Sequence, residues 1–242
     1  MKIEIVADYE ALSKRAAAIV LDRVTQRPET VLALPTGNTP IGMYKQMVQA
    51  YREGRADFGQ VWAFALDEYA EVPAEDRHSF SSFLRHHFID PVGLAARFDH
   101  LRGEASDLEA ECKRYELSIA ARGGLDLAVL GLGVNGHIAF NEPPTPFDSR
   151  THVVDLAGST REANASYFPD GFPIPNRGVT MGIGTILEAQ EILVIASGSS
   201  KAPIVARIVT AEPTVDIPAS ALKGHPHVML LLDEEAATGW KD

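Results

Sequence analysis

The sequence predicts an α/β protein with a single doubly wound, mainly parallel sheet and helices on both faces, a Rossmann-like fold in which residues 1–242 form one domain. Short, nearly continuous apolar runs alternate with segments whose apolar residues recur at helical spacing, the pattern of parallel strands buried on both faces. The 242 residues contain no internal repeat, low-complexity tract or linker, and one α/β core can accommodate that length.

In the first half, runs rich in Val, Ile, Leu and Ala predict the strands, and apolar residues three or four apart predict the helices. Thr39 is the expected N-cap of the second helix and Pro40 its first residue, because proline suits that position. In chain order the elements are a strand at 2–7, a helix at 9–25, a strand at 30–34, a helix at 40–53, a strand at 61–66, helices at 79–89 and 107–122, and a strand at 125–130.

The second half is more mixed in pattern, but it contains a clear buried strand at residues 191–196. The other expected elements are a strand at 152–156, a helix at 159–168, a helix from 201 to about 210, and a last strand at 227–232.

The charge balance excludes some partners. Lys and Arg total 22 against 33 Asp and Glu, so the net charge is -11, and such a surface should repel nucleic acid and anionic membranes. A small anion can still bind where a few cations and backbone amides converge. We therefore expect a small-molecule partner, with no nucleic acid and no membrane.

The cellular location is expected to be the cytoplasm. The start of the chain becomes charged too early for a secretory signal, and no apolar run reaches membrane-spanning length. The one cysteine, Cys112, cannot form a disulfide within the chain and lies in a predicted helix, where a buried structural thiol is the simplest interpretation.

Four polar loops come directly after predicted strands, at residues 35–39, 67–69, 131–142 and 197–201. Ligands of open parallel sheets bind beyond the carboxyl ends of the strands. Because the four loops are also the chemically richest stretches of the sequence, we expect them to form one site.

The loop of Thr36, Gly37, Asn38 and Thr39 joins a strand to a helix, so free amides and the positive end of the helix dipole can hold a phosphate. An ordinary βα turn is the alternative. The loop lacks the Gly-Lys-Ser/Thr ending of a nucleotide-binding P-loop. Lys201 ends the last of the four loops and begins the helix that follows. It is either a further contact for the anion or a surface lysine.

The glycines at 131, 133 and 136 match G-x-G-x-x-G, but Pro143 and Pro144 stand where the dinucleotide fingerprint requires a helix. We therefore expect no nicotinamide cofactor. His137 comes directly after this loop with Glu142 close behind, and a carboxylate can orient and charge a histidine for proton transfer. The other histidines lack ligand spacing, so no metal is expected.

Asp67 and Glu68 directly follow the third predicted strand, and burial can raise the pKa of such a carboxyl towards neutrality, which favours acid/base work. A helix cap or solvated loop is the alternative.

Taken together, these residues resemble the glucosamine-6-phosphate deaminase family, and the resemblance covers most of the chain. The matching segments occur in family order, and the run from Gly136 to Pro143 is specific, since 6-phosphogluconolactonases continue differently after their Gly-His. The segments are LPTGNTP at 34–40, LDEY at 66–69, GHIAFNEP at 136–143, STR at 159–161 with Asn164, and SGSSK at 197–201.

The resemblance implies conversion of glucosamine 6-phosphate and water to fructose 6-phosphate and ammonia, without a cofactor. By the resemblance, His137 moves a proton at the oxygen of the sugar ring, and Glu142 and Asn135 orient the imidazole of His137. Asp67 then takes the proton from C2 of the sugar. The resemblance further implies that the phosphate is held by the loop of Thr36, Gly37, Asn38 and Thr39 together with Lys201, with Gly136 also in the substrate site.

The sequence departs from the family pattern in three respects. Asn135 stands where longer members carry an aspartate, so its role is reduced to orientation. Ser166 replaces an arginine that grips the phosphate in many members, so phosphate binding should weaken unless Arg161 compensates. His152, Val154 and Asp155 occupy the positions of basic activator-binding residues, which predicts no allosteric activation.

Alternative functions remain open at this point. They are a 6-phosphogluconolactonase-like hydrolase, a deaminase of galactosamine 6-phosphate or an unphosphorylated amino sugar, and a sugar-phosphate-sensing regulator. The sequence leaves the C4 configuration of the sugar, the physiological direction and the choice between monomer and small homo-oligomer undecided.

Overall fold

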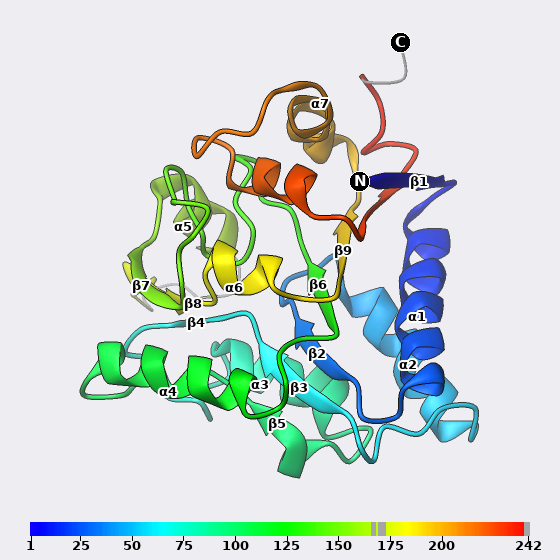
Figure 1. The fold of residues 1–242 in the computed structure, drawn as a ribbon, viewed down its shortest axis with the longest axis vertical. Coiled ribbons are helices and arrows are strands. Elements are labelled where there is room, and N and C mark those ends of the chain that lie inside the picture. The colour runs from blue at the N-terminus through cyan, green and yellow to red at the C-terminus, as the bar shows by residue number, and fades with distance from the viewer. Residues whose placement is uncertain (166–167, 169–172, 240–242) are drawn as a thin grey trace.

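The computed structural model describes residues 1–165, 168 and 173–239. Within them, the main sheet has seven parallel strands in the order β1-β10-β9-β6-β2-β3-β5 (Figure 1). This arrangement confirms the predicted α/β class. The strands are β1 (Lys2–Val6), β2 (Val31–Leu34), β3 (Trp62–Ala65), β5 (Phe98–Asp99), β6 (Leu127–Leu130), β9 (Glu191–Ala196) and β10 (Val228–Asp233).

Helices cover both faces of this sheet (Figure 1). Leu32 and Leu34 of β2 face a core built with α1 (Tyr9–Gln26) and α2 (Ile41–Arg52). Val31 and Ala33 point to the opposite core, which contains side chains of the helices α4 (Leu108–Ala120), α6 (Ile183–Leu187) and α7 (Ala202–Thr210). Successive strand residues alternate between faces, so β2 needs apolar side chains throughout.

A second sheet was not predicted. Its three antiparallel strands lie in the order β4-β8-β7, with β4 (Asp67–Tyr69), β8 (Arg177–Thr180) and β7 (His152–Asp155). The prediction placed residues 67–69 in a loop, because three mostly polar residues carry no strand pattern. Their partner strand lies more than a hundred residues later, and only Leu66 separates β3 from β4.

The start of α2 also differs from the prediction. Pro40, not Thr39, is the cap residue, and no side chain caps the helix. The hydroxyl of Tyr9 on α1 instead accepts a 2.9 Å hydrogen bond from the Gly42 amide. A tertiary contact therefore replaces the local cap.

Two further predicted helices have different bounds. The one at 79–89 is divided into α3 (Phe80–Leu84) and a π-helical turn at Arg85–Ile89. The one at 159–168 is α5 (Gly158–Asn164) and is shorter than expected. Ser166 lies outside the residues that the structure describes.

Two other features bear on the sequence-based expectations. Cys112 is buried in α4, where burial raises the pKa of its thiol to about 11, as a structural thiol should have. In the described part of the chain, no helix has both the length and the apolar character needed to cross a bilayer.

The sheet order fixes where a ligand crevice can form. Strand β2 lies between β3, the next strand in the chain, and β6, to which the chain returns later. Such a switch in strand order opens a crevice beyond the carboxyl ends of the neighbouring strands.

Candidate active site

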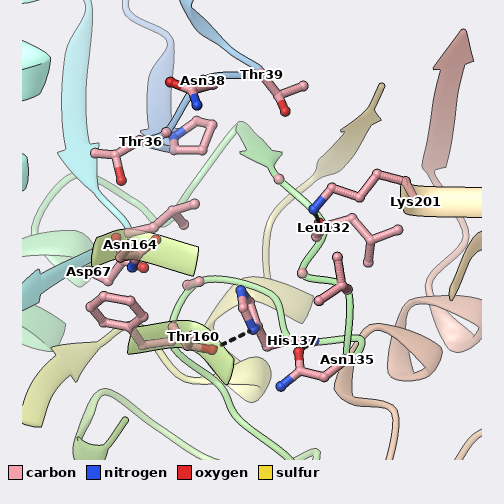
Figure 2. Close-up of a pocket in the computed structure, with 18 of the residues that line it drawn as sticks. Thr36, Asn38, Thr39, Asp67, Leu132, Asn135, His137, Thr160, Asn164 and Lys201 are labelled. Atoms are coloured by element: carbon pink, nitrogen blue, oxygen red, sulfur yellow. Dashed lines mark hydrogen bonds between the residues drawn. The ribbon is translucent and has the colours of Figure 1, made fainter. Parts of the chain in front are cut away.

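A pocket of about 450 Å³ lies at the carboxyl ends of β2, β3, β6 and β9, and side chains from all four expected loops line it (Figure 2). The expected meeting of distant loops is therefore observed. The predicted site residues among its walls are Thr36, Gly37, Asn38, Thr39, Asp67, Asn135, His137 and Lys201.

The loop after β2 is fixed from two helices. Gly37 has a positive φ of 94°, which glycine adopts without strain. The Tyr44 hydroxyl donates to the Pro35 carbonyl at 2.6 Å, and the Tyr9 hydroxyl donates to the Asn38 carbonyl at 3.1 Å. These contacts hold Thr36 and the residues after it in place before any ligand arrives, as a preformed anion cradle requires.

Lys201 faces the pocket from the segment after β9. Its ammonium group donates to the Leu132 carbonyl at 2.6 Å, and burial lowers its pKa. Among the described residues it is the one Lys or Arg that lines the pocket. The preceding loop is anchored because the Gly198 amide donates to Asp233 at the end of β10.

The glycine loop makes room for His137. A side chain at Gly133 would meet the His137 ring at 2.4 Å, so any larger residue here would displace the imidazole. Gly136 does not line the pocket. It has a φ of 92°, a side chain there would meet Ile217, and its carbonyl accepts a bond from the Ala219 amide. Gly136 thus anchors the glycine loop to the segment at residues 217–219, on the side away from the pocket.

Glu142 lies behind the ring of His137 and does not line the pocket itself. Its Oε2 atom is 3.5 Å from His137 Nδ1 and accepts a 2.7 Å bond from Asn135 Nδ2. Burial opposes ionisation of Glu142, but hydrogen bonds from His137, Thr160 and Asn135 outweigh it and lower the pKa. Asn135 also accepts from the His137 amide at 3.2 Å. The expected orienting contacts are therefore present.

Asp67 enters the pocket from β4 and is only 6% exposed. Burial and then the charge of Glu68 raise the pKa of Asp67 well above its usual range. Burial raises the pKa of Glu68 itself to about 7, although the amides of Phe80, Ser81 and Tyr69 donate to it at 2.9 Å and favour its charged form. A buried carboxyl with a raised pKa is suited to proton transfer near neutrality.

Some site residues were not assigned from the sequence. Thr160 and Asn164 reach the pocket from α5, and Asn164 donates to the Tyr69 hydroxyl at 2.9 Å. Both belong to a segment quoted for the resemblance, but no chemical signature marks a lone Thr or Asn. The side chains of Ser197 and Ser200 also line the pocket.

Other positions singled out from the sequence lie elsewhere. Arg161 is not among the pocket residues. His152, Val154 and Asp155 lie on β7, also outside the pocket. In the part of the chain that the structure describes, no three His, Cys, Asp or Glu side chains are grouped as metal ligands.

Comparison with known proteins gives consistent matches over nearly the whole chain. The family model described as glucosamine-6-phosphate isomerases/6-phosphogluconolactonase matches residues 7–230. A protein of Shouchella clausii named glucosamine-6-phosphate deaminase is 45% identical over 239 residues, covering 98% of this chain and 97% of that protein. One of the same name from Bacillus velezensis is 47% identical and covers 96% of each.

Solved structures agree with this result. A structure described as a monomeric glucosamine-6-phosphate deaminase superposes with a TM-score of 0.95 at 42% identity, covering 98% of this chain and 99% of that one. The 6-phosphogluconolactonase of Trypanosoma brucei has a TM-score of 0.77 at 21% identity, with 98% and 97% coverage, and shows only that the fold is shared.

Proposed function

The chain belongs to the glucosamine-6-phosphate isomerase/6-phosphogluconolactonase family, and on this basis we propose that it is a glucosamine-6-phosphate deaminase. The reaction takes glucosamine 6-phosphate and water to fructose 6-phosphate and ammonia. The observation that supports the proposal is that Asp67, His137 and the loop of Thr36 to Thr39 line one pocket, as a shared sugar-phosphate site requires.

The first step is opening of the sugar ring. The imidazole of His137 takes the proton of the C1 hydroxyl and delivers a proton to the ring oxygen, so the C1–O5 bond breaks and an aldehyde forms. Glu142 stabilises the charged imidazole that exists between the two transfers, because its carboxylate lies 3.5 Å behind Nδ1.

The second step moves a proton from C2 to C1. Ionised Asp67 removes the C2 proton, the aldehyde oxygen gains a proton, and the resulting enolamine is reprotonated at C1. Water then adds to the C2 imine, and the C–N bond breaks to release ammonia and the ketose. One positioned base is enough for this exchange between neighbouring carbons.

The phosphate lies at the other side of the pocket. Thr36, Thr39 and Lys201 all line the pocket, and their backbone amides, hydroxyls and ammonium group are the donors proposed to hold the phosphate. Lys201 supplies a charge-assisted hydrogen bond, which is about twice as strong as a neutral one.

Deamination is favoured over lactone hydrolysis because relatives at 45% and 47% identity are named deaminases, whereas the lactonase structure shares 21%. The test is a panel of glucosamine 6-phosphate, galactosamine 6-phosphate, free glucosamine and 6-phosphogluconolactone, scored for ammonia release and lactone hydrolysis. We expect ammonia from glucosamine 6-phosphate above all others. Lactone hydrolysis without ammonia would contradict the proposal.

We propose in addition that the protein is a cytoplasmic monomer. The structure at 42% identity is described as monomeric and is covered over 99% of its length. Light scattering coupled to size exclusion should give a mass near the 26.2 kDa of one chain, and a stable larger mass would refute the monomer.

A further inference from the structure

We propose that Thr160 is a positioning residue that fixes the tautomer of His137, with the proton on Nδ1 and the lone pair of Nε2 directed at the substrate. Thr160 lies in α5, its side chain is buried, and its hydroxyl reaches the pocket wall beside the His137 ring (Figure 2). The consequence for catalysis rests on the proposed function, whereas the tautomer itself does not.

The contacts of the Thr160 hydroxyl define its role. It donates its single proton to Oε1 of Glu142. Its oxygen lies 3.4 Å from Nδ1 of His137. A threonine hydroxyl has one proton and two lone pairs, so once the proton is given to Glu142 the oxygen can only accept from His137.

The other neighbour of Nδ1 is also an acceptor. Oε2 of Glu142 is 3.5 Å away and already accepts from Asn135. Two acceptors therefore face the same ring nitrogen, which must carry the proton in the neutral ring. The second ring nitrogen, Nε2, then has the free lone pair.

The direction of the ring agrees with the chemistry. Figure 2 shows the nitrogen bonded to Thr160 facing down to α5, while the other ring nitrogen points away from it, towards the open part of the pocket. The charged groups that share this pocket with His137 are Asp67 on β4 and Lys201, and Glu142 lies behind the ring. An unprotonated Nε2 is the form needed to take the proton of the C1 hydroxyl.

The tautomer can be observed without substrate. In protein labelled with 15N-histidine, the ring nitrogens of His137 are assigned by their loss in His137→Gln. We expect a protonated Nδ1 and an unprotonated Nε2. A protonated Nε2 in the unsubstituted protein would overturn the inference, whatever reaction the protein catalyses.

Variants then assign the effect to the hydroxyl. Thr160→Val keeps the shape but removes one of the two acceptors that face Nδ1 of His137, so we expect a mixture of tautomers. Thr160→Ser should keep the wild-type ring spectrum. Thr145→Val is the matched control, because the Thr145 hydroxyl donates to the backbone carbonyl of Glu142 and not to its carboxylate, and it should leave the spectrum unchanged.

Kinetics provide the second readout. Thr160→Val should lower kcat by about 10- to 100-fold, the range for loss of a hydrogen bond to a charged group, with a smaller change in KM. The acid limb of its pH profile should also move. Thr160→Ser should recover most of the rate. A wild-type spectrum and pH profile in Thr160→Val, or equal damage in Thr160→Ser, would show that Thr160 acts only through packing.

Discussion

The two ends of the pocket differ in the chemical character of their side chains. The proposed phosphate end consists of Thr36, Gly37, Asn38, Thr39 and Lys201, and all but the lysine are neutral. The proposed proton-transfer end consists of Asp67, His137 and Thr160, with Glu142 behind the His137 ring. Figure 2 shows Thr36, Asn38 and Thr39 on one side of the cavity and Asp67, Thr160 and His137 on the other.

Titration behaviour separates the two ends. At the proton-transfer end, burial and the charge of Glu68 raise the pKa of Asp67, while hydrogen bonds lower that of Glu142 despite its burial. Because their pKa values are shifted in opposite directions, the two carboxyls suit different roles: Asp67 can exchange a proton, and Glu142 can stabilise the charge on His137. The phosphate end depends on fixed geometry, since tyrosine hydroxyls hold the loop from behind. Substitutions at the proton-transfer end should therefore mainly change kcat and its pH dependence. Substitutions at the phosphate end should mainly change KM.

The largest effect is expected for Asp67→Asn. An amide cannot take the C2 proton, so kcat should fall by about 10³- to 10⁴-fold, while binding of fructose 6-phosphate by calorimetry stays within a few fold. In the wild type, kcat/KM should fall on the acid side as Asp67 takes up a proton, because its raised pKa brings that loss towards neutral pH. Near-normal turnover in the variant would remove Asp67 as the base.

His137→Gln should have the next largest effect. Loss of the imidazole slows ring opening, and kcat on glucosamine 6-phosphate should fall by about 100-fold. Release of ammonia from the closed sugar, monitored in a coupled assay, measures this. An unchanged rate would refute the assigned role and would break the comparison, since the proton-transfer end would then contain one active group.

Lys201→Ala tests the phosphate end. Loss of a charge-assisted hydrogen bond should raise KM for glucosamine 6-phosphate by about 10- to 100-fold and leave KM for free glucosamine nearly unchanged. Because burial lowers its pKa, the wild-type KM should also rise earlier on the alkaline side than an exposed lysine would allow.

The matched control is Lys223→Ala, since Lys223 also donates to a backbone carbonyl but lies outside the pocket. It should leave both constants unchanged. Equal effects of Lys201→Ala on the phosphorylated and the free sugar would mean that Lys201 does not contact phosphate.

The smallest kinetic effect is expected for Glu68→Gln. Removing this charge lowers the pKa of Asp67, so the acid limb of kcat/KM should move to lower pH with kcat within about tenfold. An unmoved limb would show that burial alone sets the pKa of Asp67.

Stability gives an independent check on Glu68. Its pKa is about 7 in the folded protein against 4.5 for the free group, so the folded state holds a proton that the unfolded state releases between these values. Stability should therefore fall as pH rises from about 4.5 to 7 and level off above. When thermal unfolding is measured across this pH range, the melting temperature of Glu68→Gln should fall less steeply with pH than that of the wild type.

Much of this architecture was predictable because it depends on local pattern. Apolar periodicity, together with the polar residues at the carboxyl end of each strand, predicts the α/β class, the pocket at the strand ends, and Asp67 and His137 in one cavity. The second sheet was missed because β4 has three residues and its partner is distant in sequence. Thr160 was not singled out from the sequence, because the role proposed for it depends on contacts of its hydroxyl with Glu142 and His137 that only the fold creates.

The buried thiol of Cys112 provides a built-in probe of whether the protein is folded. The chain has one cysteine, it is packed under the sheet in α4, and its pKa of about 11 leaves almost no thiolate in the folded state. Modification by a thiol reagent therefore requires α4 to separate from the sheet. The labelling rate thus reports how readily this local unfolding occurs. Every variant described above can be screened in this way, with no added probe, to separate lost chemistry from lost structure.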